Sequence, residues 1–458
     1  MELIQMNEVL SWTGGTWTGM EKSAGLTGIS TDSRTVAPGE LFIPLSGENF
    51  DGHNYIDTAI NKGATGFLSS KPITNGHRDK GGIIVGDTLS AYQEIARGYL
   101  KKFRIPVIAV TGSNGKTTTK DLVTRILSEK FKIVKTEKNY NNEVGVPKTV
   151  LSIDSSTEAL VVELAMRGMG QIRELSRIVE PDIAVITNVG ESHIELLGSR
   201  DAIASTKGEI LEYLNPNGFA ILNADDDYYQ YMSEKSPAQV ISFGIRNKAD
   251  IMLIKKEDRG LDGYNLIVAI ESSIHSFNLP LMGEHNIYNA LAGIAVATCL
   301  RMSGKEIFNG LESVKPTEKR MEINKTPGGW VVLNDSYNAS PQSMGKALEV
   351  LRDLPCSGRK IAVLADMLEL GDIAPAAHNE IGRKAVECGV NMLFTKGELG
   401  SCIAQGAKTA ELNGELVHHL ADSGAIIEKL RGMVEPGDII LVKGSRRMKM
   451  EEIAEALI

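Results

Sequence analysis

The segment TGSNGKTTT, residues 111–119, constrains this chain more than any other stretch, because of what stands on either side of it. The run Ile105–Val110 that precedes it is apolar and typical of a buried strand. A strand, a glycine-rich loop and a helix in that order form the setting that a phosphate-binding loop needs, so an α/β nucleotide-binding domain is predicted. The helix is predicted from apolar residues that recur at helical spacing, at Leu122, Val123, Ile126 and Leu127.

Each residue type in this loop suits the binding of a phosphate chain. Gly112 and Gly115 allow the backbone to turn its N–H groups toward phosphate oxygens, and the helix N-terminus adds a favourable dipole. Lys116 can reach the β and γ phosphates, and the Thr117 hydroxyl can bind Mg²⁺. The predicted nucleotide-contacting residues of the loop are Gly112, Ser113, Asn114, Gly115, Lys116, Thr117 and Thr118.

The loop departs from the general form GxxxxGK[ST] at one position. That form requires Gly at position 110, and this chain has Val110, which leaves the shorter form GxxGKT. The alternative interpretation is a glycine-rich helix cap followed by a chance Lys-Thr pair. The flanking strand and helix favour the phosphate loop over that alternative.

The length of 458 residues is too great for one ordinary core, and three regions are predicted. Residues 1–100 hold short strands and glycine-rich turns. Residues 101–314 and 315–458 each alternate apolar runs with helical stretches, which is typical of parallel sheets covered on both faces. The predicted class is α/β, with a smaller N-terminal α/β domain, a central P-loop parallel-sheet ATPase domain and a C-terminal Rossmann-like α/β domain. The runs are Val107–Val110, Leu160–Val162, Ile183–Ile186, Ala220–Leu222, Trp330–Leu333, Ile361–Leu364, Met392–Phe394 and Ile439–Val442.

The net charge and the cysteines indicate which partners and which cellular compartment to expect. The formal net charge of −9 argues against a nucleic-acid binder, because no overall positive field draws in phosphate backbones. Four scattered cysteines without a CxxC pair fit free thiols in a reducing cytosol. There is no signal-peptide pattern, and the most apolar helical stretch, Ala290–Leu300, is too short to span a bilayer. A cytoplasmic protein without a membrane span is expected, and nothing in the sequence demands more than a monomer.

Three further side chains are candidates for binding metal ions, and each has a plainer alternative. Glu163 ends the apolar run ALVV, where a carboxylate near a phosphate loop can bind Mg²⁺ and where an ordinary strand-end charge is equally expected. His193 stands in a loop, where a lone His is more often a hydrogen-bonded structural residue. Lys207, taken alone, would be a solvated helix lysine. Spacing does not single out any of the three.

Taken together, the segments resemble the Mur ligase family, in an order that matches over nearly the whole chain. The N-terminal stretch Ile29–His53 resembles the UDP-substrate domain of that family. LNDSYNASPQSM, Leu333–Met344, resembles the branch that adds D-alanyl-D-alanine, and the DNPR motif of the diaminopimelate- or lysine-adding branch does not occur. The other segments are TGSNGKTT at Thr111, NYNNEVGVP at Asn139, VVELAMRGMG around Glu163, ITNVGESHIELLGS around His193, STKGEI at Lys207, GEHNIYNALAGIAVA at Gly283, Arg320 and KGSR at Lys443.

The resemblance implies an ATP-dependent ligase. Such an enzyme would join D-alanyl-D-alanine to the terminal carboxylate of a UDP-N-acetylmuramoyl tripeptide through an acyl phosphate, with release of ADP and phosphate. Residues 1–100 would bind the UDP substrate, 101–314 would bind ATP, and 315–458 would be the ligase domain on the dipeptide side. The implied cofactors are ATP, two Mg²⁺ ions and a CO₂-derived carbamate on Lys207. The third residue of the tripeptide, lysine or diaminopimelate, stays open.

Residue roles are carried over from the same resemblance. Lys116, His193 and Lys207 would be catalytic. Thr117 and Glu163 would bind the first Mg²⁺, and His193 with carbamylated Lys207 the second. The remaining implied contacts are Asn286 near adenine, Arg320 and Asp335 on the nucleotide from the third domain, Ser33 and Arg34 near the UDP moiety, Asn141 and Asn142 near the muramoyl peptide, and Tyr337 and Asn338 on the substrate side.

Three other readings compete with this one. A GTPase-type switch is suggested only by NKAD, residues 247–250, which matches the guanine-reading NKxD pattern, and the DxxG that a switch needs after the phosphate loop does not occur. A ligase of the same family that adds a single amino acid is the nearer alternative. A non-catalytic UDP-sugar-binding relative is the third, and the intact Lys116, Glu163 and Lys207 argue against it.

Overall fold

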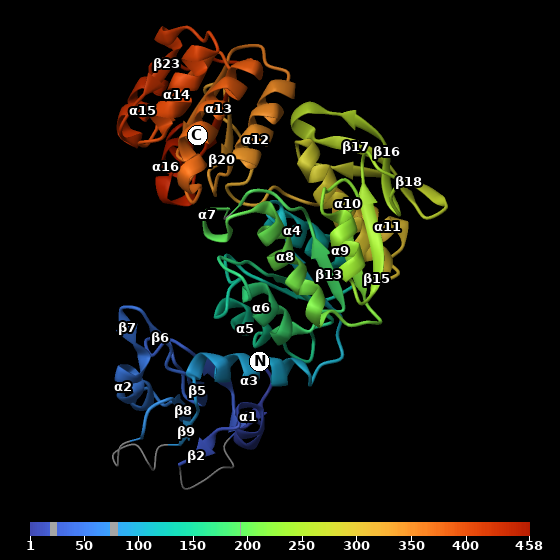
Figure 1. Ribbon diagram of the computed structural model, residues 1–458, viewed down its shortest axis with the longest axis vertical. Coiled ribbons are helices and arrows are strands. Elements are labelled where there is room, and N and C mark those ends of the chain that lie inside the picture. The colour runs from blue at the N-terminus through green and yellow to red at the C-terminus, as the bar shows by residue number, and fades with distance from the viewer. Residues whose placement is uncertain (19–24, 74–80, 193) are drawn as a thin grey trace.

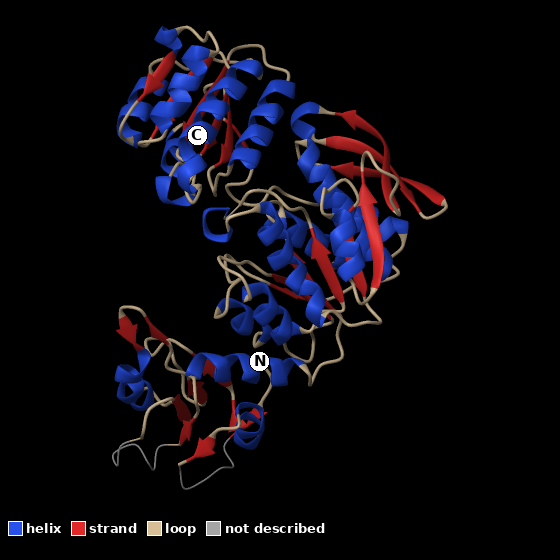
Figure 2. Ribbon diagram, viewed as in Figure 1, coloured by secondary structure: helices blue, strands red, loops and turns tan. Residues whose placement is uncertain are grey.

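The computed structural model describes residues 1–18, 25–73, 81–192 and 194–458, and it forms three α/β domains arranged in a curved row. In Figure 1 the N-terminal domain is blue, the central domain runs from blue-green to yellow, and the C-terminal domain is orange to red. Figure 2 shows that helices flank the strands in all three. The predicted α/β class with three domains is confirmed.

The N-terminal domain is built on a small sheet in the order β2-β9-β8-β5-β4. Its strands pair in parallel except for β2, which runs antiparallel to β9. Helix α3 packs against α1 and also against α5 and α6 of the central domain. The elements are β1 (Ile4–Gln5), α1 (Met6–Thr13), β2 (Thr16–Trp17), β3 (Gly25–Leu26), β4 (Gly28–Ser30), β5 (Glu40–Phe42), β6 (Ser46–Gly47), β7 (Phe50–Asp51), η1 (Gly52–Tyr55), α2 (Ile56–Asn61), β8 (Gly66–Ser69), β9 (Gly82–Ile84) and α3 (Thr88–Leu100).

The central domain has a nine-stranded sheet in the order β11-β12-β10-β13-β14-β15-β16-β17-β18. The pairs from β11 to β16 are parallel, and β16, β17 and β18 form an antiparallel extension that the apolar runs do not predict. The elements are β10 (Val107–Thr111), α4 (Lys116–Leu127), β11 (Ile133–Lys135), α5 (Gly145–Val150), β12 (Ala159–Glu163), α6 (Gln171–Val179), β13 (Ile183–Ile186), α7 (Ile194–Leu197), α8 (Arg200–Gly208), η2 (Glu209–Tyr213), β14 (Phe219–Asn223), α9 (Tyr229–Lys235), β15 (Gln239–Gly244), β16 (Ile251–Asp258), η3 (Gly260–Asp262), β17 (Tyr264–Ile270), β18 (Ser273–Leu279), α10 (Glu284–Cys299) and α11 (Gly304–Glu312).

The C-terminal domain has a six-stranded sheet in the order β19-β20-β24-β21-β22-β23, parallel except for β19. All four apolar runs predicted for this region lie on its strands. The elements are β19 (Glu322–Lys325), β20 (Val331–Asp335), α12 (Pro341–Asp353), β21 (Lys360–Ala365), η4 (Gly371–Ile373), α13 (Ala374–Glu387), β22 (Met392–Lys396), α14 (Gly400–Thr409), η5 (Gly414–Leu416), β23 (Val417–His419), α15 (Ser423–Arg431), β24 (Ile439–Lys443), η6 (Arg446–Met448) and α16 (Glu451–Ala456).

The central parallel strands are apolar throughout because both of their faces are buried. In β10, Ala109 packs into the core on one face of the sheet, and Ile108 and Val110 pack into the core on the other. Successive strand residues point to opposite faces, so a strand covered on both sides needs an unbroken apolar run. The core that contains Ala109 continues into the N-terminal domain, where it includes Ile4 and Tyr99. The predicted boundary after residue 100 therefore lies within a shared core, and it stays a prediction.

A close helix contact in the C-terminal domain yields a stability prediction. Helices α13 and α14 approach so closely that a Cβ on Gly382 would lie 2.0 Å from the Ile403 carbonyl oxygen. Gly382→Ala should therefore lower the free energy of unfolding by about 1–3 kcal/mol through overpacking. Gly345→Ala in α12 is the control, because no atom lies within 4 Å of its Cβ position. The control should raise stability by about 0.5–1 kcal/mol. Urea denaturation would measure both variants, and equal effects would contradict the packing argument.

Candidate functional site

The phosphate loop lies at the carboxyl end of β10, between the strand and α4. Gly112 has φ 149° and Gly115 has φ 81°, conformations that favour glycine. A Cβ on Gly112 would lie 1.9 Å from the Thr187 hydroxyl oxygen, and a Cβ on Gly115 would lie 2.5 Å from Asn289 Oδ1. Strand β10 has β12 on one side and β13 on the other, so the loop opens where the strand connections diverge, the usual ligand position in such sheets.

The residues after β13 hold the loop in shape. Asn188 Oδ1 accepts the Asn114 N–H at 3.1 Å, and Asn188 Nδ2 donates to the Asn114 carbonyl at 3.0 Å. Thr187 Oγ1 donates to the same carbonyl at 2.6 Å. The Ser113 hydroxyl, in turn, accepts the Gly190 N–H at 2.8 Å. The loop is therefore fixed by its neighbour strand before any ligand binds.

Lys116 is the first residue of α4, and its ammonium folds back over the loop. Its Nζ donates to the Gly112 carbonyl at 2.8 Å and to the Ser113 carbonyl at 3.3 Å. Burial lowers the pKa of Lys116, and the charge of Arg320 lowers it further, whereas Glu163 works in the opposite direction. The ammonium thus stands on the rim of the loop, where an incoming phosphate can exchange for the carbonyls.

Thr117, Glu163 and Asn141 form a polar cluster beside the loop. Thr117 Oγ1 donates to Glu163 Oε2 at 2.8 Å, and Asn141 Nδ2 donates to Glu163 Oε1 at 2.8 Å. Glu163 ends β12 and is only 3% exposed. A hydroxyl and a buried carboxylate are oxygen donors of the kind that Mg²⁺ prefers. Asn142 is exposed, and its Oδ1 accepts the Gly145 N–H at 2.9 Å.

Lys207 is buried near the end of α8 and is 2% exposed. Burial lowers the pKa of Lys207 well below its ordinary value, and the charge of Lys116 adds to this effect. The alternative of a solvated helix lysine is therefore wrong. The predicted ligand His193 lies outside the described residues. Within residues 1–18, 25–73, 81–192 and 194–458, no group of three or more His, Cys, Asp or Glu side chains is placed to hold a metal ion.

The third domain contributes Arg320 and the end of β20. Arg320 Nη2 donates to Thr117 Oγ1 at 3.0 Å, and its guanidinium lies 4.2 Å from the Tyr337 ring centroid. Asp335 Oδ2 accepts from Lys443 Nζ at 2.6 Å, and the same ammonium donates to the Asn338 carbonyl at 3.0 Å. Arg320 thus reaches the phosphate loop, whereas Asp335 is engaged within its own domain.

Two contacts of the loop with the third domain were not predicted from the sequence. Asn114 Nδ2 donates to Gln342 Oε1 at 2.7 Å, and Ser340 Oγ donates to Asn114 Oδ1 at 3.3 Å. Ser340 caps α12, and the capping pattern is visible in the sequence. The pairing with Asn114 is not visible, because 226 residues separate the two.

Asn286 lies in α10, which packs against the phosphate-loop helix α4. Its Nδ2 donates to the Met282 carbonyl at 2.8 Å, and its Oδ1 accepts from Asn289 at 3.0 Å. Asn289 Oδ1 in turn accepts from Thr119 Oγ1 at 3.1 Å. Asn289, which the sequence analysis did not single out, thus connects Asn286 to α4.

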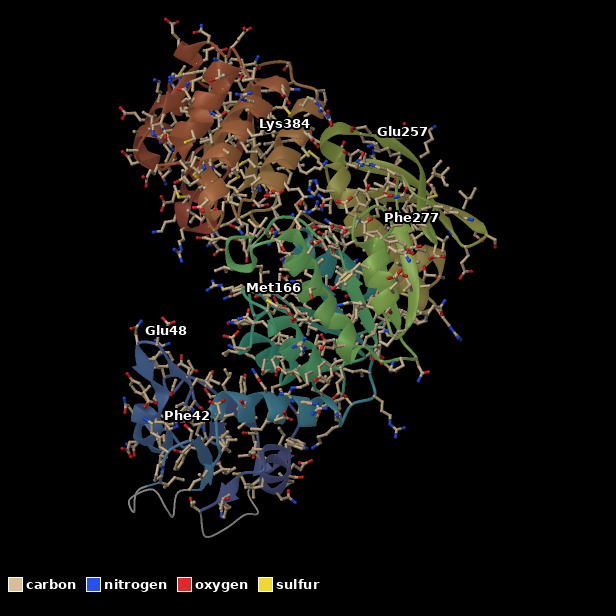
Figure 3. All side chains as sticks on the ribbon, viewed as in Figure 1. Phe42, Glu48, Met166, Glu257, Phe277 and Lys384 are labelled. Carbon is tan, nitrogen blue, oxygen red and sulfur yellow. The ribbon has the colours of Figure 1, made fainter. Side chains whose placement is uncertain are left out.

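The substrate-side candidates Ser33 and Arg34 follow β4 in the N-terminal domain, the blue body of Figure 1. Ser33 is buried, whereas Arg34 is exposed and pairs with Asp32. Hydrogen bonds from Arg34 hold the pKa of Asp32 at about 2. Figure 3 shows Met166, three residues after Glu163, on the flank of the central domain toward Glu48 of the N-terminal domain in this view. The structure does not bring Ser33 and Arg34 to the phosphate loop.

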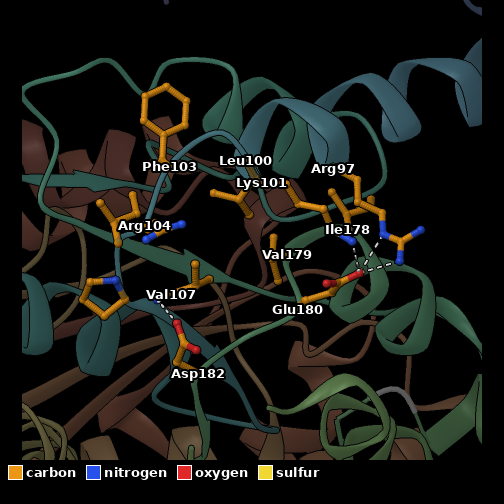
Figure 4. Close-up of a pocket in the computed structure, with 12 residues that line it drawn as sticks. Arg97, Leu100, Lys101, Phe103, Arg104, Val107, Ile178, Val179, Glu180 and Asp182 are labelled. Atoms are coloured by element: carbon orange, nitrogen blue, oxygen red, sulfur yellow. Dashed lines mark hydrogen bonds and ion pairs between the residues drawn. The ribbon is translucent and has the colours of Figure 1, made fainter. Parts of the chain in front are cut away.

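A cavity of about 500 Å³ lies elsewhere, at the opposite end of β10 (Figure 4). Its lining includes Val107, the first residue of that strand, whereas the phosphate loop follows Thr111, the last. Two of its lining cations, Arg97 and Lys101, already pair with Glu180, at 2.8 Å and 3.1 Å. This cavity is separate from the nucleotide site and offers no phosphate-binding loop.

A glycine loop with its lysine, a buried carboxylate beside it and an arginine from a second α/β domain form a candidate nucleotide site of the P-loop type between two domains. Family models agree: the Mur ligase family catalytic domain matches residues 25–112, the Mur ligase middle domain 110–297, and the Mur ligase glutamate ligase domain 319–446. The chain belongs to the Mur ligase family.

Several relatives of this chain share one name. UDP-N-acetylmuramoyl-tripeptide--D-alanyl-D-alanine ligase of Bacillus subtilis is 38% identical over 94% of this chain and 93% of its own length. The protein of that name from Escherichia coli is 33% identical over 94% of both chains. A crystal structure of MurF from Acinetobacter baumannii matches with a TM-score of 0.92 at 29% identity, covering 100% of this chain and 99% of that one.

A second structural relative carries a nucleotide. MurF ligase from Thermotoga maritima in complex with ADP matches with a TM-score of 0.84 at 28% identity, over 93% of this chain and 96% of that chain. No described helix of this chain is both long enough and apolar enough to cross a membrane.

The burial of Lys207 leads to a pH prediction that needs no substrate. The pKa of Lys207 in the folded protein lies below 10.5, so the unfolded chain binds more protons between that lowered value and 10.5. Stability should therefore rise with pH through this window. Lys207→Met should raise the melting temperature near pH 7 by at least about 2 °C and flatten its rise toward about pH 9.

Thermal melts in CO₂-free buffer would measure this effect. Lys325→Met is the matched control, because Lys325 is exposed, and it should leave the pH dependence of the melting temperature unchanged. If Lys207→Met follows the wild-type curve, the lysine titrates at its ordinary value and the argument from burial fails.

Proposed function

We propose that this chain joins D-alanyl-D-alanine to the terminal carboxylate of a UDP-N-acetylmuramoyl tripeptide, with ATP as the energy source. The observation that carries the proposal is the near full-length similarity to ligases of that name, 38% identical over 94% of the chain in one case. The segment DSYNASP, residues 335–341, supports the dipeptide-adding branch over relatives that add one amino acid. The reaction forms a C–N bond and yields the pentapeptide precursor of the cell wall.

Amide formation from a carboxylate needs activation, because a carboxylate is a poor electrophile. The tripeptide carboxylate attacks the γ-phosphorus of ATP, which gives an acyl phosphate and ADP. The amine of D-alanyl-D-alanine then attacks the acyl carbon and expels phosphate. Both ATP and the tripeptide carboxylate are anionic, so the site must offset their repulsion. Positioning the reactants together removes several kcal/mol of the barrier, an order-of-magnitude figure for well-oriented reactions.

The chain supplies positive charge and donors for the phosphates from two sides. Backbone N–H groups at the N-terminus of α4 and the Lys116 ammonium lie on the central-domain side. Arg320, which reaches Thr117 at 3.0 Å, approaches from the third domain. Preorganised donors of this kind stabilise charge that develops during phosphoryl transfer. Asn286, on the helix that packs against α4, is assigned to the adenine side, and Asp335 to nucleotide contact from the third domain.

Two Mg²⁺ ions are assigned to this site, and the hydroxyl of Thr117 and the carboxylate of Glu163 are oxygen donors that suit the first. Thr117 and Glu163 would hold the first, and His193 with a carbamate on Lys207 the second. The bound ions would offset phosphate charge. An ammonium beside two cations would be repelled, whereas burial lowers the pKa of Lys207 and so favours the neutral amine, the form that can take up CO₂. The carbamate adds oxygen ligands to a site that has few carboxylates.

The remaining assignments concern substrate and setting. Ser33 and Arg34 are assigned to the UDP moiety, and Asn141 and Asn142 to the muramoyl peptide. Tyr337 and Asn338 are assigned to the dipeptide side. The chain is assigned to the cytoplasm as a monomer. The net charge of −9 argues against a nucleic-acid partner.

The NKAD segment has a structural role that weakens the GTPase alternative. Asp250 Oδ2 accepts the Ser242 N–H at 2.8 Å and the Ser242 hydroxyl at 2.6 Å, which ties the start of β16 to β15. Asn247 Nδ2 donates to the Ala224 carbonyl at 2.9 Å. Both side chains that would read guanine are engaged in holding this turn.

An acceptor panel tests the proposed reaction. ADP release should require both UDP-muramoyl tripeptide and D-alanyl-D-alanine, and GTP should not replace ATP. Lys116→Ala should lower kcat by about 10²–10³ or more, because it removes charge that stabilises the transition state, while the circular dichroism spectrum stays unchanged. Turnover with lysine or diaminopimelate and a UDP-muramoyl dipeptide, but not with D-alanyl-D-alanine, would refute the assignment.

The carbamate on Lys207 is tested by chemical rescue. Lys207→Ala should lose nearly all activity, by about 10²-fold or more, and recover part of it with added formate or acetate, which replace an anionic ligand. Lys207→Arg keeps the positive charge and should not be active. An active Lys207→Arg enzyme would instead indicate that the lysine contacts phosphate as an ammonium.

A further inference from the structure

The segment that joins the central and third domains lies along one face of the phosphate-loop helix. This linker, residues 313–321, runs from the end of α11 to the start of β19. Residues 117, 121 and 125 are spaced by four in α4 and so share one face of the helix. That face contacts the linker at three points: Arg125 Nε donates to Ser313 Oγ, Thr317 Oγ1 donates to Asp121 Oδ2 at 2.8 Å, and Arg320 Nη2 donates to Thr117 Oγ1 at 3.0 Å.

The linker and α4 run in opposite directions along this face, and their contacts follow one another in order. Ser313, the linker residue closest to the central domain in sequence, pairs with Arg125 near the C-terminal end of α4. Arg320 pairs with Thr117 at the N-terminal end, where the phosphate loop leads into the helix. A shift of the linker along this face would therefore move Arg320 away from Thr117. The middle contact, between Thr317 and Asp121, is the one that fixes the register.

Asp121 is held in its charged form at this middle position. Burial works against the charge, but Lys120 at 3.1 Å and Lys135 at 3.2 Å outweigh it and hold the pKa of Asp121 below its usual value. Lys120 is itself buried and donates to the Thr136 carbonyl at 2.9 Å. The Thr136 hydroxyl accepts the Glu163 N–H at 3.0 Å. The linker anchor and the carboxylate assigned to Mg²⁺ thus belong to one connected set of contacts.

The residues on either side of Arg320 have unfavourable backbone conformations, which neighbouring contacts must hold in place. Lys319 has φ 59° and Met321 has φ 51°, left-handed conformations that cost about 1 kcal/mol or more for residues other than glycine. The third domain supports this turn through the Tyr337 N–H, which donates to the Lys319 carbonyl at 3.0 Å, and through Asp335 Oδ1, which accepts the Met321 N–H at 3.1 Å. Support from the central domain comes from α4.

We propose that Asp121 and Thr317 are positioning residues that hold the interdomain linker in register on α4, so that Arg320 is aimed at the phosphate site. Their part in the reaction is indirect and runs through Arg320. The inference rests on the proposed ligase function for its kinetic consequence. Its geometric content, that α4 sets the position of the third-domain arginine, does not depend on which amine the enzyme accepts.

The test compares three threonine variants. Thr317→Val removes the hydroxyl at nearly constant volume and should lower kcat about tenfold, with the KM values for both peptide substrates changed by less than about twofold. Thr317→Ser keeps the hydroxyl and should retain at least about half of the wild-type kcat. Thr124→Val is the matched control on α4, because the Thr124 hydroxyl donates to the Lys120 carbonyl within the helix and not to the linker. A Thr317→Val enzyme with the kcat of the Thr124→Val control overturns the proposal.

A double-mutant cycle distinguishes positioning from general destabilisation. In an Arg320→Ala background, Thr317→Val should have no further effect on kcat, because the arginine it positions is absent. Asp121→Asn should lower kcat by a similar factor, and Asp121→Asn with Thr317→Val should be no worse than Asp121→Asn alone. Thr317→Val that lowers kcat by the same factor with and without Arg320 overturns the proposal.

ATP binding measured by calorimetry separates this inference from the proposed function. Thr317→Val should weaken ATP binding about threefold in the Arg320 background and not in the Arg320→Ala background. That comparison requires no peptide substrate. If the wild-type enzyme rejects D-alanyl-D-alanine but the calorimetric pattern holds, the substrate assignment fails and the linker inference stands. If ligation proceeds and the calorimetric pattern is absent, the linker inference fails alone.

Discussion

A loop of backbone N–H groups can bind phosphate only if its own carbonyls and side chains are held out of the way. In this protein that work is done largely by Thr187 and Asn188 at the end of β13, which occupy the Asn114 carbonyl and N–H. Gly112 also lies close to Thr187. A side chain at position 112 would push the ends of the two strands apart. The shape of the phosphate site therefore depends on the packing of β10 against β13, a contact deep in the central sheet.

Charged side chains of both signs interact around the phosphate loop. The ammonium of Lys116 lies within electrostatic reach of the buried carboxylate Glu163, of Arg320 and of Lys207. The lowered pKa of Lys207 relieves part of the excess of positive charge by favouring the neutral amine. An anionic substrate chain would relieve the remainder, so the site is electrostatically suited to polyphosphate before any metal is considered. The third domain takes part in this balance through Arg320, whose guanidinium lies over the Tyr337 ring, while Asp335 accepts the N–H of the next residue, Met321.

The sequence predicts those parts of the structure whose pattern is local. Strands β10, β12, β13 and β14 follow from unbroken apolar runs because both faces of each are buried. The antiparallel extension β16–β18 was missed, since β16 ends in exposed charged residues and carries no such run. Phosphate-loop residues are visible from their spacing, whereas the burial of Lys207 is not, because the groups around it come from other segments. The partners of Asn114, which directly follow β13 or lie at the start of α12, are likewise set by tertiary packing rather than by local pattern.

The packing of helix α3 limits how domains can be exchanged between members of this family. The helix belongs to the N-terminal segment in sequence, yet it packs on α5 and α6, and its Tyr99 hydroxyl donates to the Ile153 carbonyl of the central domain at 2.6 Å. A chimaera joined at residue 100 would carry a foreign helix onto the native central surface. A crossover ahead of the helix cap at Asp87 would instead keep α3 with α5 and α6 and would place the foreign junction at its contact with α1, so either junction must match both partners of this helix.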